Sequence, residues 1–211
     1  MMEIVADQLG KRFDREWIFK DFSFNFFSGN TYALTGPNGS GKSTLLQVLW
    51  GQMLPSKGTV GYHQNNSVIP TEELYQHISI ATPYMDLIEE FSLEEMVAFH
   101  FQHKQARQKS DIQQVLERME LDHARYKHIR DFSSGMRQRL KLALAFFSQS
   151  QVLFLDEPTT NLDQTAIQWY WQQLDALPND QLVLIASNQS DEYPSSAQKV
   201  DILQYKRGYK T

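Results

Sequence analysis

The chain has 211 residues, of which 41% are hydrophobic and 21% are charged, and this composition fits one soluble globular unit with room for an inserted subdomain. A formal net charge of −5 gives no general reason to expect nucleic-acid binding, and the lack of cysteine excludes a disulfide framework and a thiolate metal site. The N-terminus lacks a basic segment followed by an apolar core, so no signal peptide is expected. The longest clearly apolar stretch, Leu142–Phe147, is too short to span a bilayer.

The N-terminal stretch, to about Tyr62, has the pattern of β-strands. Trp17–Phe27 is aromatic and partly alternating, as a sheet segment should be. Ser28–Asn30 predicts a turn into a short strand at Thr31–Thr35, and a further strand is expected at Thr59–Tyr62.

A glycine-rich segment follows the strand at Thr31–Thr35 and fits the pattern G-x-x-x-x-G-K-[ST]. Such a loop points backbone N–H groups at phosphate oxygens, while its lysine faces the β- and γ-phosphates and its serine offers a hydroxyl to Mg²⁺. A glycine turn matching by accident is the alternative, at about one chance in a hundred, and the predicted helix after Thr44 disfavours it. The predicted nucleotide-binding residues are Gly36, Pro37, Asn38, Gly39, Ser40, Gly41, Lys42, Ser43 and Thr44.

The middle of the chain, from about Tyr84 to Gln149, has helical spacing. Ser92 followed by Glu95 forms a capping-box signature, and apolar residues within Asp111–Glu120 recur at helical intervals. We expect the histidines and other polar residues here to lie on solvated helix faces rather than in a metal site.

Two continuous apolar runs, Gln151–Leu155 and Leu182–Ala186, are typical of strands buried in a parallel sheet, with a crossover helix from Gln164 to Leu177. Asp156 and Glu157 end the first run, at the sheet edge where ligands bind. Asp156 would hold Mg²⁺, and Glu157 would act as general base on the attacking water. Two acidic residues that merely end a strand are the alternative.

The phosphate loop, the segment Asp131–Arg139, the two carboxylates and Asn161–Asp163 together resemble the nucleotide-binding domains of ABC ATPases, from about Ile4 to Leu203. The family's L-S-G-G-Q signature stands here as Phe132–Met136, with a serine for one glycine and a methionine for the glutamine. The resemblance implies that this segment holds the γ-phosphate of ATP bound on the opposite subunit. The residues so implied are Ser133, Ser134 and Gly135.

The resemblance adds two further binding residues. Asp163 matches an aspartate at the family's subunit interface, although the residues alone indicate only a turn and a helix cap. Phe13 matches the aromatic that stacks on adenine, with a core side chain as the alternative.

Two departures from the family pattern concern hydrolysis. Asn188 stands where the family usually has a histidine; its amide can hydrogen-bond a γ-phosphate but cannot transfer a proton. The family's glutamine at the junction into the helical insert is missing, because no glutamine occurs between Ile78 and Phe101. The catalytic set predicted from the sequence is Glu157, Lys42 and Asn188.

We therefore expect an α/β fold, a P-loop NTPase parallel-sheet core with an antiparallel β-subdomain and a helical insert. Residues 1–211 would form one ABC ATPase domain, with 1–83 and 149–211 as the nucleotide-binding core and 84–148 as the helical subdomain carrying the signature. The resemblance implies a MgATP-hydrolysing subunit, dimeric with itself or another ABC ATPase, that docks its helical subdomain on a membrane permease at the inner face of the cell membrane. A non-transport assembly ATPase and a regulatory subunit with weak hydrolysis remain alternatives.

Overall fold

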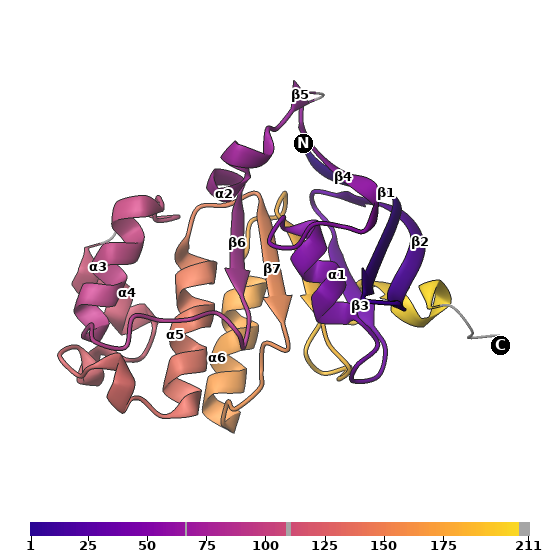
Figure 1. Cartoon of the computed structure of the whole chain (residues 1–211). Helices are drawn as coiled ribbons and strands as arrows, with labels where there is room; N and C mark the ends of the chain where they lie inside the picture. Colours follow the sequence, from indigo (N-terminus) through magenta and orange to yellow (C-terminus); the bar gives the residue numbers. More distant parts are fainter. Residues whose placement is uncertain (66, 109–110, 207–211) are drawn as a thin grey trace. The chain divides into compact units, whose positions relative to one another are not determined.

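The computed structural model describes residues 1–65, 67–108 and 111–206 (Figure 1). The chain forms two compact units. The first contains Met1–Ile78, Gln151–Glu157 and Asn179–Thr211, and the second contains Ser79–Ser150 and Pro158–Pro178. Each unit is therefore built from segments that are far apart in the sequence.

An antiparallel sheet forms the N-terminal part of the first unit, in the strand order β2-β1-β4-β5. Alternate residues are buried in the first part of β1, from Met2 to Ala6, as expected for a strand with one face on a core. Phe22 and Phe26 are fully buried, and the ring of Phe26 packs edge-on at 5.0 Å from that of Tyr32. The predicted strands at Trp17–Phe27 and Thr59–Tyr62 are confirmed. The strands are β1 (Met2–Phe13), β2 (Glu16–Phe27), β4 (Lys57–Gln64) and β5 (Ser67–Val68).

Parallel strands form the second layer of the first unit, in the order β7-β8-β3-β9. Every residue of β7 and β8 is buried, which confirms that the two apolar runs are interior strands. Because these strands are parallel, their carboxyl ends meet at one edge of the sheet. The strands are β3 (Thr31–Thr35), β7 (Val152–Asp156), β8 (Leu182–Ala186) and β9 (Gln198–Asp201).

Short helices complete the first unit. Helix α1 follows β3 directly after the glycine-rich loop, and Trp50 at its end packs edge-on against Phe154 of β7 at 5.6 Å. Strand β6 (Ile78–Ala81) begins at the last residue of the first unit and continues into the second. The helices of the first unit are α1 (Lys42–Leu49), η1 (Thr71–Glu73), α2 (Leu74–His77) and η4 (Ile202–Tyr205).

The second unit is mainly helical. Side chains of α5 and α6 form its centre, where Phe146 lies 6.1 Å from the ring of Trp169 and 5.9 Å from that of Tyr170. Trp169 also donates through Nε1 to the backbone oxygen of Arg118 at 2.9 Å. The helices are α3 (Leu93–His103), α4 (Ile112–Arg118), η2 (Asp122–Ala124), η3 (Ile129–Asp131), α5 (Ser134–Phe147) and α6 (Gln164–Asp175).

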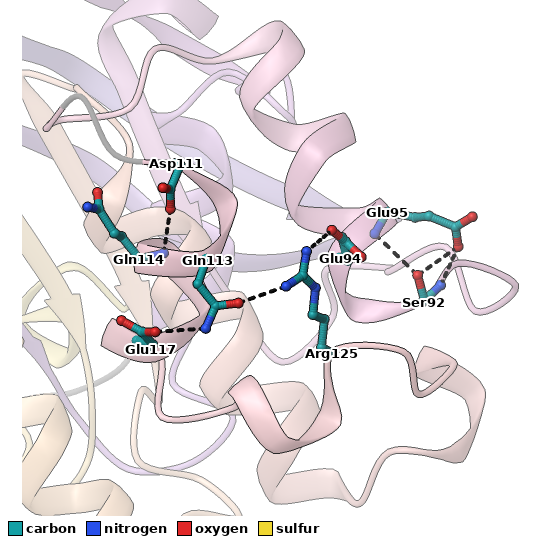
Figure 2. A network of polar contacts seen from close by, with 8 residues as sticks. All are labelled: Ser92, Glu94, Glu95, Asp111, Gln113, Gln114, Glu117 and Arg125. Carbon is teal, nitrogen blue, oxygen red and sulfur yellow. Dashed lines mark hydrogen bonds and ion pairs between the residues drawn. The ribbon is translucent and has the colours of Figure 1, made fainter.

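Polar side chains connect α3, α4 and the segment after η2 (Figure 2). Arg125 donates to Glu94 on α3 and to Gln113 on α4, and the latter bond is 2.8 Å long. The predicted capping box at Ser92 and Glu95 is confirmed, since each bonds the other's backbone N–H. This network fixes the helices that precede the signature segment.

One histidine does not lie on a solvated helix face, contrary to the expectation from the sequence. His100 is half-buried on α3, and its Nε2 lies 2.8 Å from the hydroxyl of Ser148. Burial lowers the pKa of His100 to about 4, so its imidazole is neutral near pH 7. Sequence spacing alone gives no sign of this contact, because it joins residues that are distant in the chain.

No helix among the described residues is long and apolar enough to cross a membrane.

Candidate functional site

The glycine-rich loop between β3 and α1 has a backbone that only glycine adopts without strain. Gly36 and Gly41 have φ angles of 143° and 104°, in the region that L side chains rarely adopt. A Cβ on Gly41 would lie 2.5 Å from Cγ2 of Ile18, so β2 packs directly against the loop. The loop conformation therefore depends on glycine for both backbone geometry and space.

Lys42 is buried at the first turn of α1, at 4% exposure. Its ammonium donates to the backbone oxygens of Gly36 at 2.9 Å and Pro37 at 3.2 Å. Burial lowers the pKa of Lys42, and the charges of Glu157, Asp156 and Glu192 oppose this shift. The ammonium of Lys42 is thus held inside the loop by backbone oxygens, and it is subject to the charges of carboxylates at and beyond the ends of β7 and β8.

Asp156 ends β7 and meets the loop residue Ser43. The Ser43 hydroxyl donates to Oδ1 of Asp156 at 3.0 Å, whereas Oδ2 is buried and has no hydrogen-bond partner among the described residues. Burial raises the pKa of Asp156 to about 6, with the neighbouring charge of Glu157 adding to the effect and Ser43 opposing it. An unpartnered carboxylate oxygen beside a hydroxyl is a fitting ligand pair for a small oxygen-seeking cation.

Glu157 follows Asp156 in a strained backbone conformation. Its φ of 44° is in the left-handed region, which costs a non-glycine residue on the order of 1–2 kcal/mol. Its N–H donates to the oxygen of Ala186 at 2.9 Å, which extends the pairing of β7 with β8 by one residue. The charge of its side chain acts on Lys42.

Asn188 lies just beyond β8 and reaches the phosphate loop. Its amide donates to Oδ1 of Asn38 at 2.9 Å. Both side chains are exposed. Because β3 and β8 are parallel neighbours, the residues that follow them come together at one edge of the sheet.

Sequence reasoning missed two buried residues at this edge, Ser187 and Glu192. Both are 0% exposed, and the Ser187 hydroxyl donates to Oε2 of Glu192. Glu192 stands among polar residues that predict an ordinary loop, and no spacing indicates that its carboxylate turns inward.

Phe13 lies at the end of β1 and is 47% exposed, so its ring is not part of the core. The ammonium of Lys11 lies 5.3 Å from the centre of the ring, a cation–π contact. The ring is therefore exposed, and its stacking on adenine stays a prediction.

The signature segment belongs to the second unit, where it begins α5. Ser133 caps the helix by accepting a hydrogen bond from the N–H of Met136 at 3.2 Å. A Cβ on Gly135 would lie 2.9 Å from the backbone oxygen of Asn161, so only glycine fits there. Residues Ser133, Ser134, Gly135, Asn161 and Asp163 are among those lining a pocket of about 530 Å³.

Asp163 caps α6, because its carboxylate accepts from the N–H of Ala166 at 2.8 Å. The predicted helix cap is thus confirmed; Asp163 also lines the pocket beside the signature segment, and its place at a subunit interface stays a prediction. At the junction that lacks glutamine, the buried Lys141 of α5 donates to the oxygen of Pro83 at 2.6 Å. That lysine was not singled out from the sequence.

A family model described as ABC transporter matches residues 19–160, which is well over half of the chain. The chain belongs to the ABC transporter family of ATP-binding proteins. This result agrees with the phosphate loop, the strand carboxylates and the signature segment found in the sequence.

Relatives of this ABC ATPase cover nearly all of it. It is similar to the uncharacterized ABC transporter ATP-binding protein YcbN of Bacillus subtilis (strain 168), with 27% identity over 202 residues, 95% of this chain and 66% of the relative. It is also similar to ATP-binding cassette sub-family A member 2 of Rattus norvegicus, with 23% identity over 207 residues, 96% of this chain and 8% of the relative. The chain therefore spans only part of these curated relatives.

The fold is that of solved ABC ATPases. A structure of an ATP-binding subunit of an ABC transporter aligns with a TM-score of 0.79 at 21% identity, covering 94% of this chain and 85% of that one. The predicted fold class, with its parallel and antiparallel sheets, is confirmed.

Proposed function

We propose that this chain is the ATP-binding and ATP-hydrolysing subunit of an ABC transporter, and that it energises a separate membrane permease through ATP-dependent dimerisation. The observation that carries the proposal is the contact of Ser43 with Asp156 next to the buried ammonium of Lys42. A cation, a hydroxyl and a carboxylate at the end of a parallel strand are the groups needed to hold a magnesium–triphosphate.

The loop Gly36–Thr44 would hold the β- and γ-phosphates of ATP. Its backbone N–H groups and the N-terminus of α1 supply positive potential, and Lys42 would exchange its bonds with Gly36 and Pro37 for bonds with phosphate oxygens. Phe13, half-exposed on β1, would stack on the adenine.

Ser43 and Asp156 would hold Mg²⁺ together with phosphate oxygens. The buried Oδ2 of Asp156, which lacks a partner among the described residues, supports this assignment. No cluster of three or more acidic, histidine or cysteine side chains that could hold a metal occurs among the described residues, at this site or elsewhere. When bound there, the cation supplies charge neutralisation for the phosphates.

Glu157 would accept a proton from the water that attacks the γ-phosphorus, as the bond to the oxygen of the departing ADP breaks. The strained backbone of Glu157 supports a functional role, because such strain is concentrated at active sites. Asn188 would donate its amide to the γ-phosphate, and Lys42 would stabilise the charge that develops there.

Dimerisation would complete the site. Ser133, Ser134 and Gly135 line a pocket together with Asp163, and they would contact the γ-phosphate of ATP bound on a second subunit, either a copy of this chain or another ABC ATPase. The N-terminus of α5 supports this role, since helix N-termini attract anions.

The permease would be a separate integral membrane protein that docks on the helical subdomain, residues 84–148, and the ATPase would lie at the inner face of the cell membrane.

We propose a regulatory subunit with weak hydrolysis as the second candidate. Asn188 favours it, because an amide cannot take up or release a proton. A soluble assembly ATPase is distinguished from both by the absence of a membrane partner.

The test is affinity purification of the tagged chain from its native membrane, followed by steady-state ATPase assays on the purified material. Co-purification of a protein with several apolar spans of about 20 residues and MgATP turnover is the expected result. Binding of that protein without turnover would favour the regulatory subunit. Turnover without any membrane protein would favour the assembly ATPase.

A further inference from the structure

A buried glutamate lies in the loop that follows β8, where the sequence indicates only a polar turn. Glu192 is 0% exposed, although its neighbours Asn188, Gln189, Ser190 and Asp191 are all exposed. Burying a carboxylate carries a large desolvation cost unless hydrogen bonds and nearby charge compensate. Its inward position therefore requires a structural reason.

The Ser187 hydroxyl contacts this carboxylate. It lies within hydrogen-bonding distance of two acceptors, Oε2 of Glu192 and the backbone oxygen of Gln189 at 3.0 Å. A hydroxyl has one proton, and the bond to Oε2 of Glu192 is the shorter of the two, so the proton is donated to Glu192. The oxygen of Ser187 in turn accepts from the N–H of Gln189 at 2.8 Å.

Ser187 is thereby fixed on both sides. Its backbone N–H donates to the oxygen of Leu34 in β3 at 3.1 Å, and its side chain is held by Glu192. A second turn bond, from the N–H of Glu192 to the oxygen of Gln189 at 3.4 Å, closes the loop on itself. Asn188 is the next residue along the chain, and it points to Asn38 of the phosphate loop.

We propose that Glu192 is a positioning residue that, through the Ser187 hydroxyl, fixes the loop so that the Asn188 amide faces the γ-phosphate position. This inference rests on the proposed function, because it assigns Asn188 a phosphate to face. The hydrogen bond, rather than the charge of Glu192, is the part of the interaction that fixes the loop.

The surroundings agree with this assignment. The charge of Glu192 also acts on Lys42 and Asp156, so the carboxylate lies close to the phosphate site. An exposed amide such as that of Asn188 has several rotamers, and holding its backbone reduces the freedom lost when phosphate binds.

Substitutions at the two partners test the proposal. Glu192→Gln keeps an acceptor for the Ser187 hydroxyl, whereas Glu192→Ala and Ser187→Ala each remove the bond from one side. We expect both alanine variants to lower kcat about tenfold to a hundredfold with little change in the KM for ATP, and Glu192→Gln to restore most of kcat. Asp191→Ala, in the same loop but exposed, is the matched control.

Because Glu192 acts through Asn188, the two substitutions should not add. Asn188→Ala should lower kcat far less in the Glu192→Ala background than in wild type. Full additivity would overturn the proposal, as would a Glu192→Gln variant as slow as Glu192→Ala, which would assign the effect to charge. If Glu192→Ala fails to fold, Ser187→Ala gives the same comparison with a smaller change.

Amide hydrogen exchange gives a readout that does not depend on hydrolysis. In protein without nucleotide, Glu192→Ala and Ser187→Ala should speed exchange at residues 188–192 by at least about tenfold, while exchange in the core strands stays as in wild type. Unchanged exchange in this loop would overturn the positioning role. A wild type that does not hydrolyse ATP would instead overturn the proposed function, and the exchange result would still decide the loop's role.

Discussion

Asp156 offers a test in which stability and function change in opposite directions. Its carboxylate is buried at 1% exposure, and burial raises its pKa from 3.8 to about 6. The pKa difference of about 2 corresponds to a free energy of about 3 kcal/mol. Near neutral pH, the ionised carboxylate destabilises the folded protein without nucleotide by about this amount. Asp156→Asn removes that charge and keeps an oxygen that accepts from Ser43.

The sign of the pH dependence follows from the raised pKa. As pH rises from about 4 to about 6, the unfolded chain loses the Asp156 proton while the folded protein retains it, so folded stability falls. Above the pKa of Asp156 in the folded protein, this loss of stability is complete. We therefore expect Asp156→Asn to match wild type near pH 4 and to exceed its free energy of unfolding by about 2–3 kcal/mol near pH 7.5.

Urea unfolding of the protein without nucleotide, at several pH values between about 4 and about 7.5, measures this difference in the free energy of unfolding. Asp175→Asn, at an exposed position at the end of α6, is the control and should change little at any pH. Adding MgATP should stabilise wild type but not Asp156→Asn, because the substitution removes a ligand of the cation. A variant that is no more stable than wild type near pH 7.5 would refute the electrostatic reasoning.

Three further substitutions address the phosphate site. Lys42→Ala should lower MgATP affinity at least about a hundredfold in calorimetric titration, because a buried cation facing the phosphates is lost. Lys57→Ala, at an exposed position, should bind as wild type does, and equal affinities of Lys42→Ala and wild type would contradict the loop assignment. Glu157→Gln should keep ATP binding and accumulate an ATP-bound dimer in size-exclusion chromatography; a monomer at saturating MgATP would count against dimerisation. Asn188→His should remain active and add an ionisation near pH 6.5 to the rate profile, which wild type lacks; identical profiles would show that this side chain does not contact the reacting phosphate.

Much of the fold could be predicted because its signals are local. The runs that became β7 and β8 are apolar throughout since both faces are buried, and Ser92 and Glu95 are separated by the fixed spacing of a capping box. The glycine loop is equally local, because phosphate binding requires its residues at fixed spacing along the chain.

The remaining features arise from contacts between segments distant in the sequence. Lys141 reaches the oxygen of Pro83 only because α5 packs beside the junction, and the half-buried His100 contacts Ser148, 48 residues further along the chain. Glu192 has no spacing signal, since its inward turn depends on how the loop after β8 closes. The roles of Phe13 and Asn188 rested on family resemblance and stay predictions.

Phosphate release from γ-labelled ATP, by purified wild type, Glu157→Gln and Lys42→Ala, tests the central claim most directly. We expect Mg²⁺-dependent release by wild type and at least about a hundredfold less release by both variants, of which only Glu157→Gln should retain ATP. Equal release by all three proteins would contradict it.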